Sequence, residues 1–309
     1  MRIVSFLPSA TEIVCSLGLA DELVGITHEC NYPPEAQGKP IVVRNAIKME
    51  GMTDWEIDET VSRVLRSGGT LYRVNESLLR ELDPDIIMTQ NLCQVCAPSG
   101  NEVSVVLKSL PRKPQILWLT PKNLGGIFEN ILAVGAATGK TDVANKNIEA
   151  LKVRVEFVRN KAQKIRKKPH VFLMEWFDPL YCGGHWIQEL TEIAGGRDAL
   201  ARQGRDSVRI SWQEVKDWAP EVLILSPCGY NLEDAVKHAK DLPREPVWNE
   251  LPAVRMNQVY AVDAQSYFAR PGPRIVDGLE LLAHLIHPEE FSWHGPKDAY
   301  ERFAHHDVR

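Results

Sequence analysis

A single apolar seam at helical spacing runs between residues 141 and 168 and divides the chain into two halves. Apolar residues recur there at alternating intervals of four and three, and most other positions are polar or charged. This is the pattern of one long helix with a buried stripe, and the stripe consists of Ala144, Ile148, Leu151, Val155, Val158, Ala162 and Ile165. Because no matching heptads occur elsewhere in the sequence, a coiled-coil dimer is disfavoured. We therefore predict a spine helix at 140–168 that joins two lobes.

Short apolar strands alternate with helical segments on both sides of the predicted spine helix. Before it the strands read RIVSFL, ELVGIT, PIVVR, DIIMT and PQILWLT, and after it they read HVFLMEW, EVLIL and QVYAVD. Such alternation is typical of a parallel sheet covered by helices on both faces. We predict an α/β fold with mainly parallel sheets, divided into an N-terminal lobe (1–139), the spine helix (140–168), a C-terminal lobe (169–288) and a C-terminal tail (289–309).

A capping pattern predicts where the first helix begins. Ser9 and Glu12 have the spacing of a capping box, in which a Ser side chain caps the helix and a Glu three residues later bonds back to the cap. Gly18 is typical of the position just beyond a helix end. We expect this helix to be capped by Ser9 and to stop before Gly18.

Charge and hydropathy argue against two classes of function. The formal net charge is −5, so the chain offers no basic field to nucleic acid or to an anionic membrane. No apolar run approaches the roughly 20 residues that a membrane-spanning helix needs. The first apolar run ends at Pro8, which is too early for a secretory signal. We expect a cytoplasmic protein without membrane insertion, or a periplasmic one if the sequence is that of a processed chain.

The cysteines suggest a metal site. Cys93 and Cys96 form a Cys-x-x-Cys pair directly after an apolar strand, and Cys30 follows another strand. Three thiolates that leave one position open suit zinc or an iron–sulfur cluster, and His28 and Cys228 are further candidate ligands. Two alternatives remain open: a redox pair at the start of a helix, and thiols that only fill space in the core.

Many of the reactive side chains follow predicted strands. In open parallel sheets, ligands bind beyond the carboxyl ends of the strands. If the two lobes face each other, these side chains would line one cleft. The residues that we expect to contact a ligand there are Ser9, His28, Glu175, Trp176, His185, Trp186, Tyr267 and Arg270, in addition to the cysteines.

Individual residues of this set allow more than one interpretation. Glu175 ends a strongly apolar strand, where a carboxylate is costly to bury unless it is paired, and Arg270 is a natural partner. Arg270 could instead bind an anionic group of a ligand. The aromatic rings suit a large flat ligand, although they are also ordinary core residues. His28 and His185 could each be structural histidines. Nucleotide-binding and serine-hydrolase motifs do not occur.

The sequence resembles the helical-spine (class III) substrate-binding proteins of ABC importers, which bind cobalamin, haem and iron chelates. The resemblance rests on RIVSFLPSATEIVCSLG, LLRELDPDIIMTQ, WQEVKDWAPEVLIL and FARPGPRIVDGLELLAHLI, together with the spine helix. Within that class the chain is most similar to the cobalamin-binding type, and HEC, CQVC and GGHW resemble a subfamily without signal sequences. The resemblance implies two Rossmann-like lobes that hold a ligand between them. It also implies a docking glutamate for the permease on each lobe, where this chain has Ser77 and Gln213 with Glu76 and Glu214 beside them.

Two main hypotheses of function follow. The first is a non-enzymatic protein that binds a cobalamin-like corrinoid, another tetrapyrrole or a metal chelate. The second is a cytoplasmic metalloprotein or enzyme in which Cys30, Cys93 and Cys96 hold zinc or an iron–sulfur cluster. In an enzyme, Glu175 or His185 would act as acid or base. A third interpretation is a scaffold whose cysteines are all structural.

Overall fold

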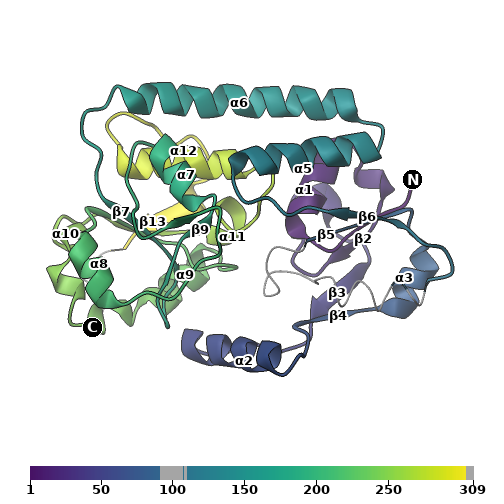
Figure 1. Ribbon diagram of the computed structural model, residues 1–309, viewed down its shortest axis with the longest axis horizontal. Coiled ribbons are helices and arrows are strands. Elements are labelled where there is room, and N and C mark those ends of the chain that lie inside the picture. Colours follow the sequence, from purple (N-terminus) through teal and green to yellow (C-terminus); the bar gives the residue numbers. More distant parts are fainter. Residues whose placement is uncertain (91–106, 108–109, 304–309) are drawn as a thin grey trace. The chain divides into compact units, whose positions relative to one another are not determined.

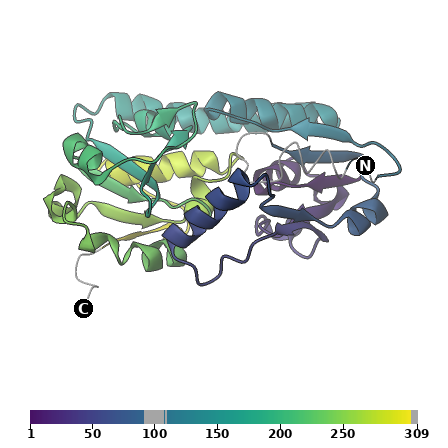
Figure 2. The ribbon, with the colours of Figure 1, turned by 60° about the horizontal axis from the view of Figure 1, so that its bottom comes forward.

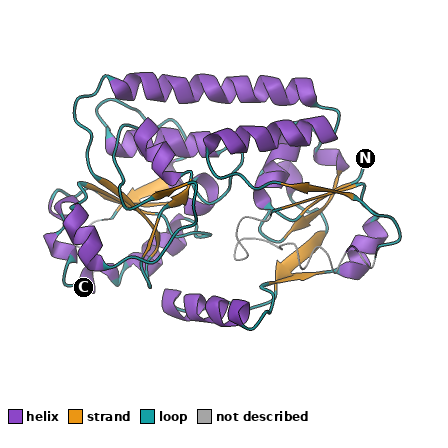
Figure 3. Ribbon diagram, in the orientation of Figure 1, coloured by secondary structure: helices purple, strands orange, loops and turns teal. Residues whose placement is uncertain are grey.

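The computed structural model describes residues 1–90, 107 and 110–303, and these residues form two compact units (Figure 1). The first unit contains 1–52, 56–121 and 125–150, and the second contains 53–55, 122–124 and 151–309. In both units helices flank a sheet of strands (Figure 3). The predicted two-lobe α/β fold is therefore confirmed.

The sheet of the first unit is mainly parallel. Among the described residues its strand order is β4-β3-β2-β1-β5-β6, and every neighbouring pair is parallel except β3 and β4. The strands are β1 (Ile3–Ser5), β2 (Leu23–Thr27), β3 (Ile41–Asn45), β4 (Tyr72–Val74), β5 (Ile86–Thr89) and β6 (Gln115–Trp118). The strands predicted from the apolar runs are thus present, and β4 is an additional edge strand.

The helices of the first unit begin and end at recognisable signals. The elements are α1 (Pro8–Ser16), η1 (Ala20–Glu22), η2 (Pro34–Ala36), α2 (Asp54–Arg66), α3 (Glu76–Leu82) and α5 (Leu124–Ala137). Asn75 caps α3 by accepting a hydrogen bond from the backbone N–H of Leu78 at 3.1 Å. The predicted Ser9 cap is wrong. Helix α1 begins at Pro8, whose fixed φ and missing N–H suit the first helical position, so Ser9 lies inside the first turn.

The second unit also has a mainly parallel sheet, with order β13-β12-β11-β7-β8. Strands β7, β11 and β12 pair in parallel, whereas β8 and β13 are antiparallel at the two edges. A separate two-stranded ladder joins β9 to β10. The strands are β7 (Val171–Trp176), β8 (Tyr181–Cys182), β9 (Gly184–His185), β10 (Arg202–Gln203), β11 (Val222–Leu225), β12 (Val259–Val262) and β13 (Tyr300–Arg302). The segment predicted as a tail therefore supplies an edge strand of this sheet.

The remaining α-helices of the described chain lie mainly in the second unit. They are α6 (Thr141–Gln163), α7 (Ile187–Ile193), α8 (Trp212–Trp218), α9 (Leu232–Ala239), α10 (Pro252–Arg255), α11 (Ala264–Tyr267) and α12 (Ile275–Ile286), with short 3₁₀ turns η3 (Leu242–Arg244), η4 (Trp248–Glu250) and η5 (Lys297–Ala299). Helices α7 and α12 pack against each other (Figure 1).

Helix α6 is the predicted spine helix. Six of the seven predicted stripe residues are buried, and Ile165 lies beyond the end of the helix. In the second unit, α6 runs beside α12 (Figure 2), and Arg154 joins them. The Arg154 guanidinium lies 2.5 Å from the Asp277 carboxylate and 2.7 Å from the Glu280 carboxylate. These two ion pairs join α6 to α12.

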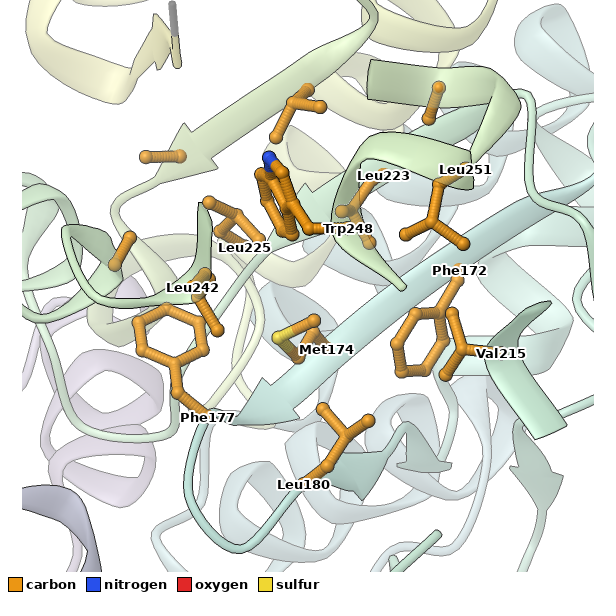
Figure 4. Packing of buried hydrophobic residues seen from close by; sticks show 14 of the residues in the cluster. Phe172, Met174, Phe177, Leu180, Val215, Leu223, Leu225, Leu242, Trp248 and Leu251 are labelled. Atoms are coloured by element: carbon orange, nitrogen blue, oxygen red, sulfur yellow. The ribbon is translucent and has the colours of Figure 1, made fainter. Parts of the chain in front are cut away.

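The core of the second unit is a cluster of large apolar side chains. Figure 4 shows Phe172, Met174, Leu223, Leu225 and Trp248 packed together from β7, β11 and η4, each no more than 1% exposed. Burying a side chain of this size contributes about 1.5–3 kcal/mol. The apolar residues that identify β7 and β11 in the sequence are thus the ones that pack into the core of this unit.

We expect Leu223→Ala to lower the free energy of unfolding of the second unit by about 2–5 kcal/mol, because it removes buried methyl groups and leaves a cavity. Urea unfolding followed by circular dichroism measures the loss. Met256→Ala is the control, since Met256 is 45% exposed and its truncation should change stability by no more than about 0.5 kcal/mol. Equal effects of the two substitutions would contradict this description of the core.

Candidate functional site

The loops that follow the parallel strands of the second unit are joined to one another. Strands β7, β11 and β12 run in the same direction, so their carboxyl ends lie at one edge of the sheet. The backbone N–H of Cys228, after β11, donates to the carbonyl of Glu175 in β7 at 2.9 Å. The N–H of Gln265, after β12, donates to the carbonyl of Tyr230 at 2.9 Å. These bonds bring residues from three strand ends into one site, which we call the carboxyl edge.

Aromatic rings gather at the carboxyl edge. The rings of Trp176 and Tyr230 lie 5.3 Å apart, and both are partly exposed. The indole N–H of Trp186 donates to the carbonyl of Phe268 at 2.9 Å. Trp186 and Tyr267 are each 6% exposed, so they pack within the unit, whereas Trp176 and Tyr230 are more exposed. Burial, the largest cause, raises the pKa of Tyr267 to about 12.

Tyr230 was not among the residues that the sequence identified. It lies in Gly-Tyr-Asn directly after Cys228, and Gly and Asn at such positions are typical of a turn. Its position just beyond a parallel strand is the signal that could have found it.

His185 occupies a strained position beside these rings. Its φ is +52°, in the left-handed region that costs a non-glycine residue on the order of 1–2 kcal/mol. Its Nε2 lies 3.1 Å from Asp206 Oδ1, and its ring centre is 5.4 Å from that of Trp186. Burial lowers the pKa of His185, against the opposing charge of Asp206. Burial thus favours the neutral form of the imidazole, which contacts Asp206 and the ring of Trp186.

Glu175 lies where the pairing of β7 with β8 is irregular. The register shifts between Met174 and Trp176, and such bulges redirect the side chain of the extra residue. The Glu175 carboxylate accepts hydrogen bonds from the backbone N–H of Gly184 at 3.1 Å and from the Ser207 side chain. Burial raises its pKa to about 6 despite these bonds. Both of these hydrogen-bond donors are neutral groups. Arg270 is 5% exposed, and its predicted pairing with Glu175 stays a prediction.

Asp198 is a second buried carboxylate, and the sequence did not identify it. It is 2% exposed and accepts hydrogen bonds from the backbone N–H groups of Leu173, Leu200 and Ala201 at 3.0–3.2 Å. Burial, the largest cause, raises its pKa to about 7. An Asp that bonds to backbone groups two and three residues ahead is typical of turns, and GGRDAL carries that signal. Asp198 thus ties the segment before β10 to β7.

The first unit places its candidate residues in satisfied environments. Ser9 is 5% exposed and Cys30 is 6% exposed, and the Cys30 sulfur lies 3.0 Å from the Thr11 hydroxyl. The Nδ1 of His28 lies 3.2 Å from the Thr27 hydroxyl and 3.3 Å from the Val43 carbonyl. These contacts agree with the structural alternatives for Cys30 and His28.

The described residues do not assemble the predicted metal site. Cys93 and Cys96 lie outside them, so the geometry of the Cys-x-x-Cys pair is not described. Cys30 belongs to the first unit and Cys228 to the second. Among residues 1–90, 107 and 110–303, no group of three or more His, Cys, Asp and Glu side chains is arranged to hold a metal ion. The described donor set therefore does not fit zinc or an iron–sulfur cluster.

The positions expected to dock a permease have local partners. Glu214 accepts hydrogen bonds at 2.8 Å from both the backbone N–H and the hydroxyl of Ser211, which completes a capping box at the start of α8. These bonds lower the pKa of Glu214. The Gln213 amide donates to Asp217 at 2.7 Å, and the Ser77 hydroxyl donates to Asn75 at 2.8 Å. The carboxylate of Glu214 thus serves the helix cap.

We expect Asp198→Asn to change how stability depends on pH. Because the pKa of Asp198 is raised in the folded state, the folded chain holds this proton more tightly than the unfolded chain. Its contribution to stability is therefore greatest near pH 4 and is lost as the pH rises to about 7. The stability difference between wild type and Asp198→Asn should fall by at least about 1 kcal/mol over that range. Urea unfolding between pH 4.5 and 7.5 tests this, and a constant difference would contradict it.

The family comparison covers most of the chain. A family model described as periplasmic binding protein matches residues 3–266. The Bacillus subtilis protein YvrC, described as an uncharacterized ABC transporter substrate-binding lipoprotein, is 27% identical over 298 residues, which cover 94% of this chain and 81% of that one. A vitamin B12-binding protein of Vibrio cholerae is 25% identical over 92% of this chain and 88% of its own length.

Solved structures show the same fold. The periplasmic vitamin B12-binding protein of Vibrio cholerae has a TM-score of 0.66 and 23% identity, over 92% of this chain and 96% of that one. The apo periplasmic heme-binding protein of Roseiflexus sp. RS-1 has a TM-score of 0.70 and 19% identity, over 93% and 98%.

These relatives also bear on location and family. No helix in the described part of the chain is long and apolar enough to cross a membrane. The names of the relatives describe a lipoprotein and periplasmic proteins, so they give no support to the cytoplasmic location predicted from the sequence. The resemblance to substrate-binding proteins is confirmed. Because the family model matches 3–266 of 309 residues, the chain belongs to the periplasmic binding protein family.

Proposed function

We propose that this protein binds a cobalamin-like corrinoid, another tetrapyrrole or a metal chelate, and that the carboxyl edge of the second unit contacts the ligand. The observation that carries the proposal is the partly exposed pair of Trp176 and Tyr230, whose rings lie 5.3 Å apart at the ends of two parallel strands. Aromatic faces of this kind provide large, rigid contact areas for flat ligands. The vitamin B12-binding and heme-binding names of the relatives support this class of ligand.

The other candidate residues take distinct roles in the proposal. Trp176 and Tyr230 pack against the ligand, and the imidazole of His185 gives it a polar contact. Trp186 and Tyr267, each 6% exposed, support the edge from beneath. Arg270 would bind an anionic substituent such as a phosphate or a carboxylate. Ser9 and His28 stay predicted contacts from the first unit, as does the predicted cleft between the lobes. The proposal assigns no catalytic residue.

We expect purified protein to bind cyanocobalamin or hemin, and Trp176→Ala to weaken that binding about tenfold or more, since one good ring contact is worth about 1.4 kcal/mol. Isothermal titration and quenching of tryptophan fluorescence measure the affinity. Phe157→Ala is the control, because Phe157 is 64% exposed on α6 and is not part of the carboxyl edge.

Three ligands decide the result: cyanocobalamin, hemin and a ferric hydroxamate chelate. Binding of one of them that weakens in Trp176→Ala and not in Phe157→Ala supports the proposal. Absence of binding for all three, or equal effects of the two substitutions, would contradict it.

A further inference from the structure

The Glu175 carboxylate bonds to a neighbouring turn of its own unit. Its Oε1 accepts a hydrogen bond from the backbone N–H of Gly184 at 3.1 Å, and Ser207 donates a second. Gly184 is the residue immediately before His185, and Trp186 follows. A bond to the Gly184 N–H therefore acts on the backbone that carries both His185 and Trp186.

The turn at Gly184 has little freedom to move in any other direction. A Cβ added to Gly184 would lie 2.5 Å from the backbone nitrogen of Ser207, so the two backbones are in close contact. The N–H of His185 donates to the Arg205 carbonyl at 2.7 Å, and the His185 carbonyl accepts from Gly204 at 2.8 Å. Glu175, which lies in β7, adds the hydrogen bond to the Gly184 N–H.

The conformation of His185 shows why the turn needs these contacts. Its φ of +52° is unfavourable for a residue with a side chain. Such a conformation persists only where the surroundings enforce it, and it occurs most often at functional sites. The bonds on both sides of His185 provide that enforcement.

We propose that Glu175 is a positioning residue: its carboxylate, by accepting the Gly184 N–H, fixes the turn that presents His185 and Trp186 at the carboxyl edge. The effect on affinity rests on the function proposed above, whereas the effect on the turn does not. The role requires a hydrogen-bond acceptor at this position rather than a direct contact between Glu175 and the ligand.

Two substitutions of Glu175 by residues of similar size distinguish a role as hydrogen-bond acceptor from a role that only fills space. In Glu175→Gln the amide oxygen can still accept the Gly184 N–H, whereas in Glu175→Met no comparable acceptor is present. Hydrogen–deuterium exchange of the ligand-free protein, resolved at the Gly184 amide by NMR, reads the bond directly. We expect exchange about tenfold faster or more in Glu175→Met, and within about threefold of wild type in Glu175→Gln.

The exchange results test, without any ligand, whether Glu175 positions the turn at Gly184. Wild-type exchange at Gly184 in Glu175→Met would overturn the proposal. So would equally fast exchange in both variants, because the charge rather than the acceptor would then matter. Circular dichroism and the exchange of core amides in β11 verify that each variant is folded. If Glu175→Met unfolds, Glu175→Ala takes its place with the same readout at the Gly184 amide, and wild-type exchange there would overturn the proposal.

Titration with cyanocobalamin and hemin then tests the consequence for affinity. We expect Glu175→Met to weaken binding about tenfold and Glu175→Gln to restore it to within about threefold of wild type. Equal affinity of wild type and Glu175→Met, despite a loosened turn, would overturn the effect on the ligand. Failure of the wild type to bind either probe would overturn the proposed function and the effect on affinity with it, while the exchange data still decide the hydrogen bond.

Discussion

Parallel pairing of buried apolar strands is the constraint on which the second unit depends. Strands β7, β11 and β12 share one direction because helices and loops return the chain to the same end of the sheet. All three strand ends therefore deliver their loops to one edge. The core residues Phe172, Leu223 and Leu225 hold the strands in register. That register places the loops that follow β7, β11 and β12.

Two buried carboxylates contact strand β7 of this apolar sheet. Asp198 accepts a hydrogen bond from the backbone N–H of Leu173 in β7. Glu175, at the bulge of β7, accepts one from the backbone N–H of Gly184. Their raised pKa values show that burial disfavours their charged forms more than these bonds favour them. Burying these groups therefore costs stability at a pH where they would otherwise be charged. His185 has a strained φ of +52°, and such conformations cluster at functional sites.

Much of the fold could be predicted from the sequence because apolar periodicity reports burial directly. The stripe of α6 and the strands β1, β7 and β11 were recognisable, since each buries a continuous set of apolar side chains. The start of α1 was not, because Ser9 and Pro8 are both plausible at a helix start and the backbone geometry decides between them. Strand β13 was missed because an edge strand of three residues, one of them partly buried and two exposed, has almost no periodic signal.

The candidate site could be predicted only in outline. The direction of β7 was enough to place Glu175 and Trp176 at its carboxyl end, as predicted. Asp198 and Tyr230 were missed because their roles depend on contacts between segments far apart in the sequence. The buried state of Trp186 and Tyr267 could not be inferred either, since aromatic residues look alike in sequence whether they pack inside or face a ligand.

The most direct measurement of the central claim is a crystal structure of the protein soaked with cyanocobalamin, with diffraction recorded at the cobalt absorption edge. Anomalous scattering locates the metal independently of any assumption about the ligand's pose. The account predicts one strong cobalt peak at the carboxyl edge, with the corrin in contact with Trp176 and Tyr230. A peak away from both rings, or crystals that take up no cobalt and no hemin iron in a parallel soak, would contradict it.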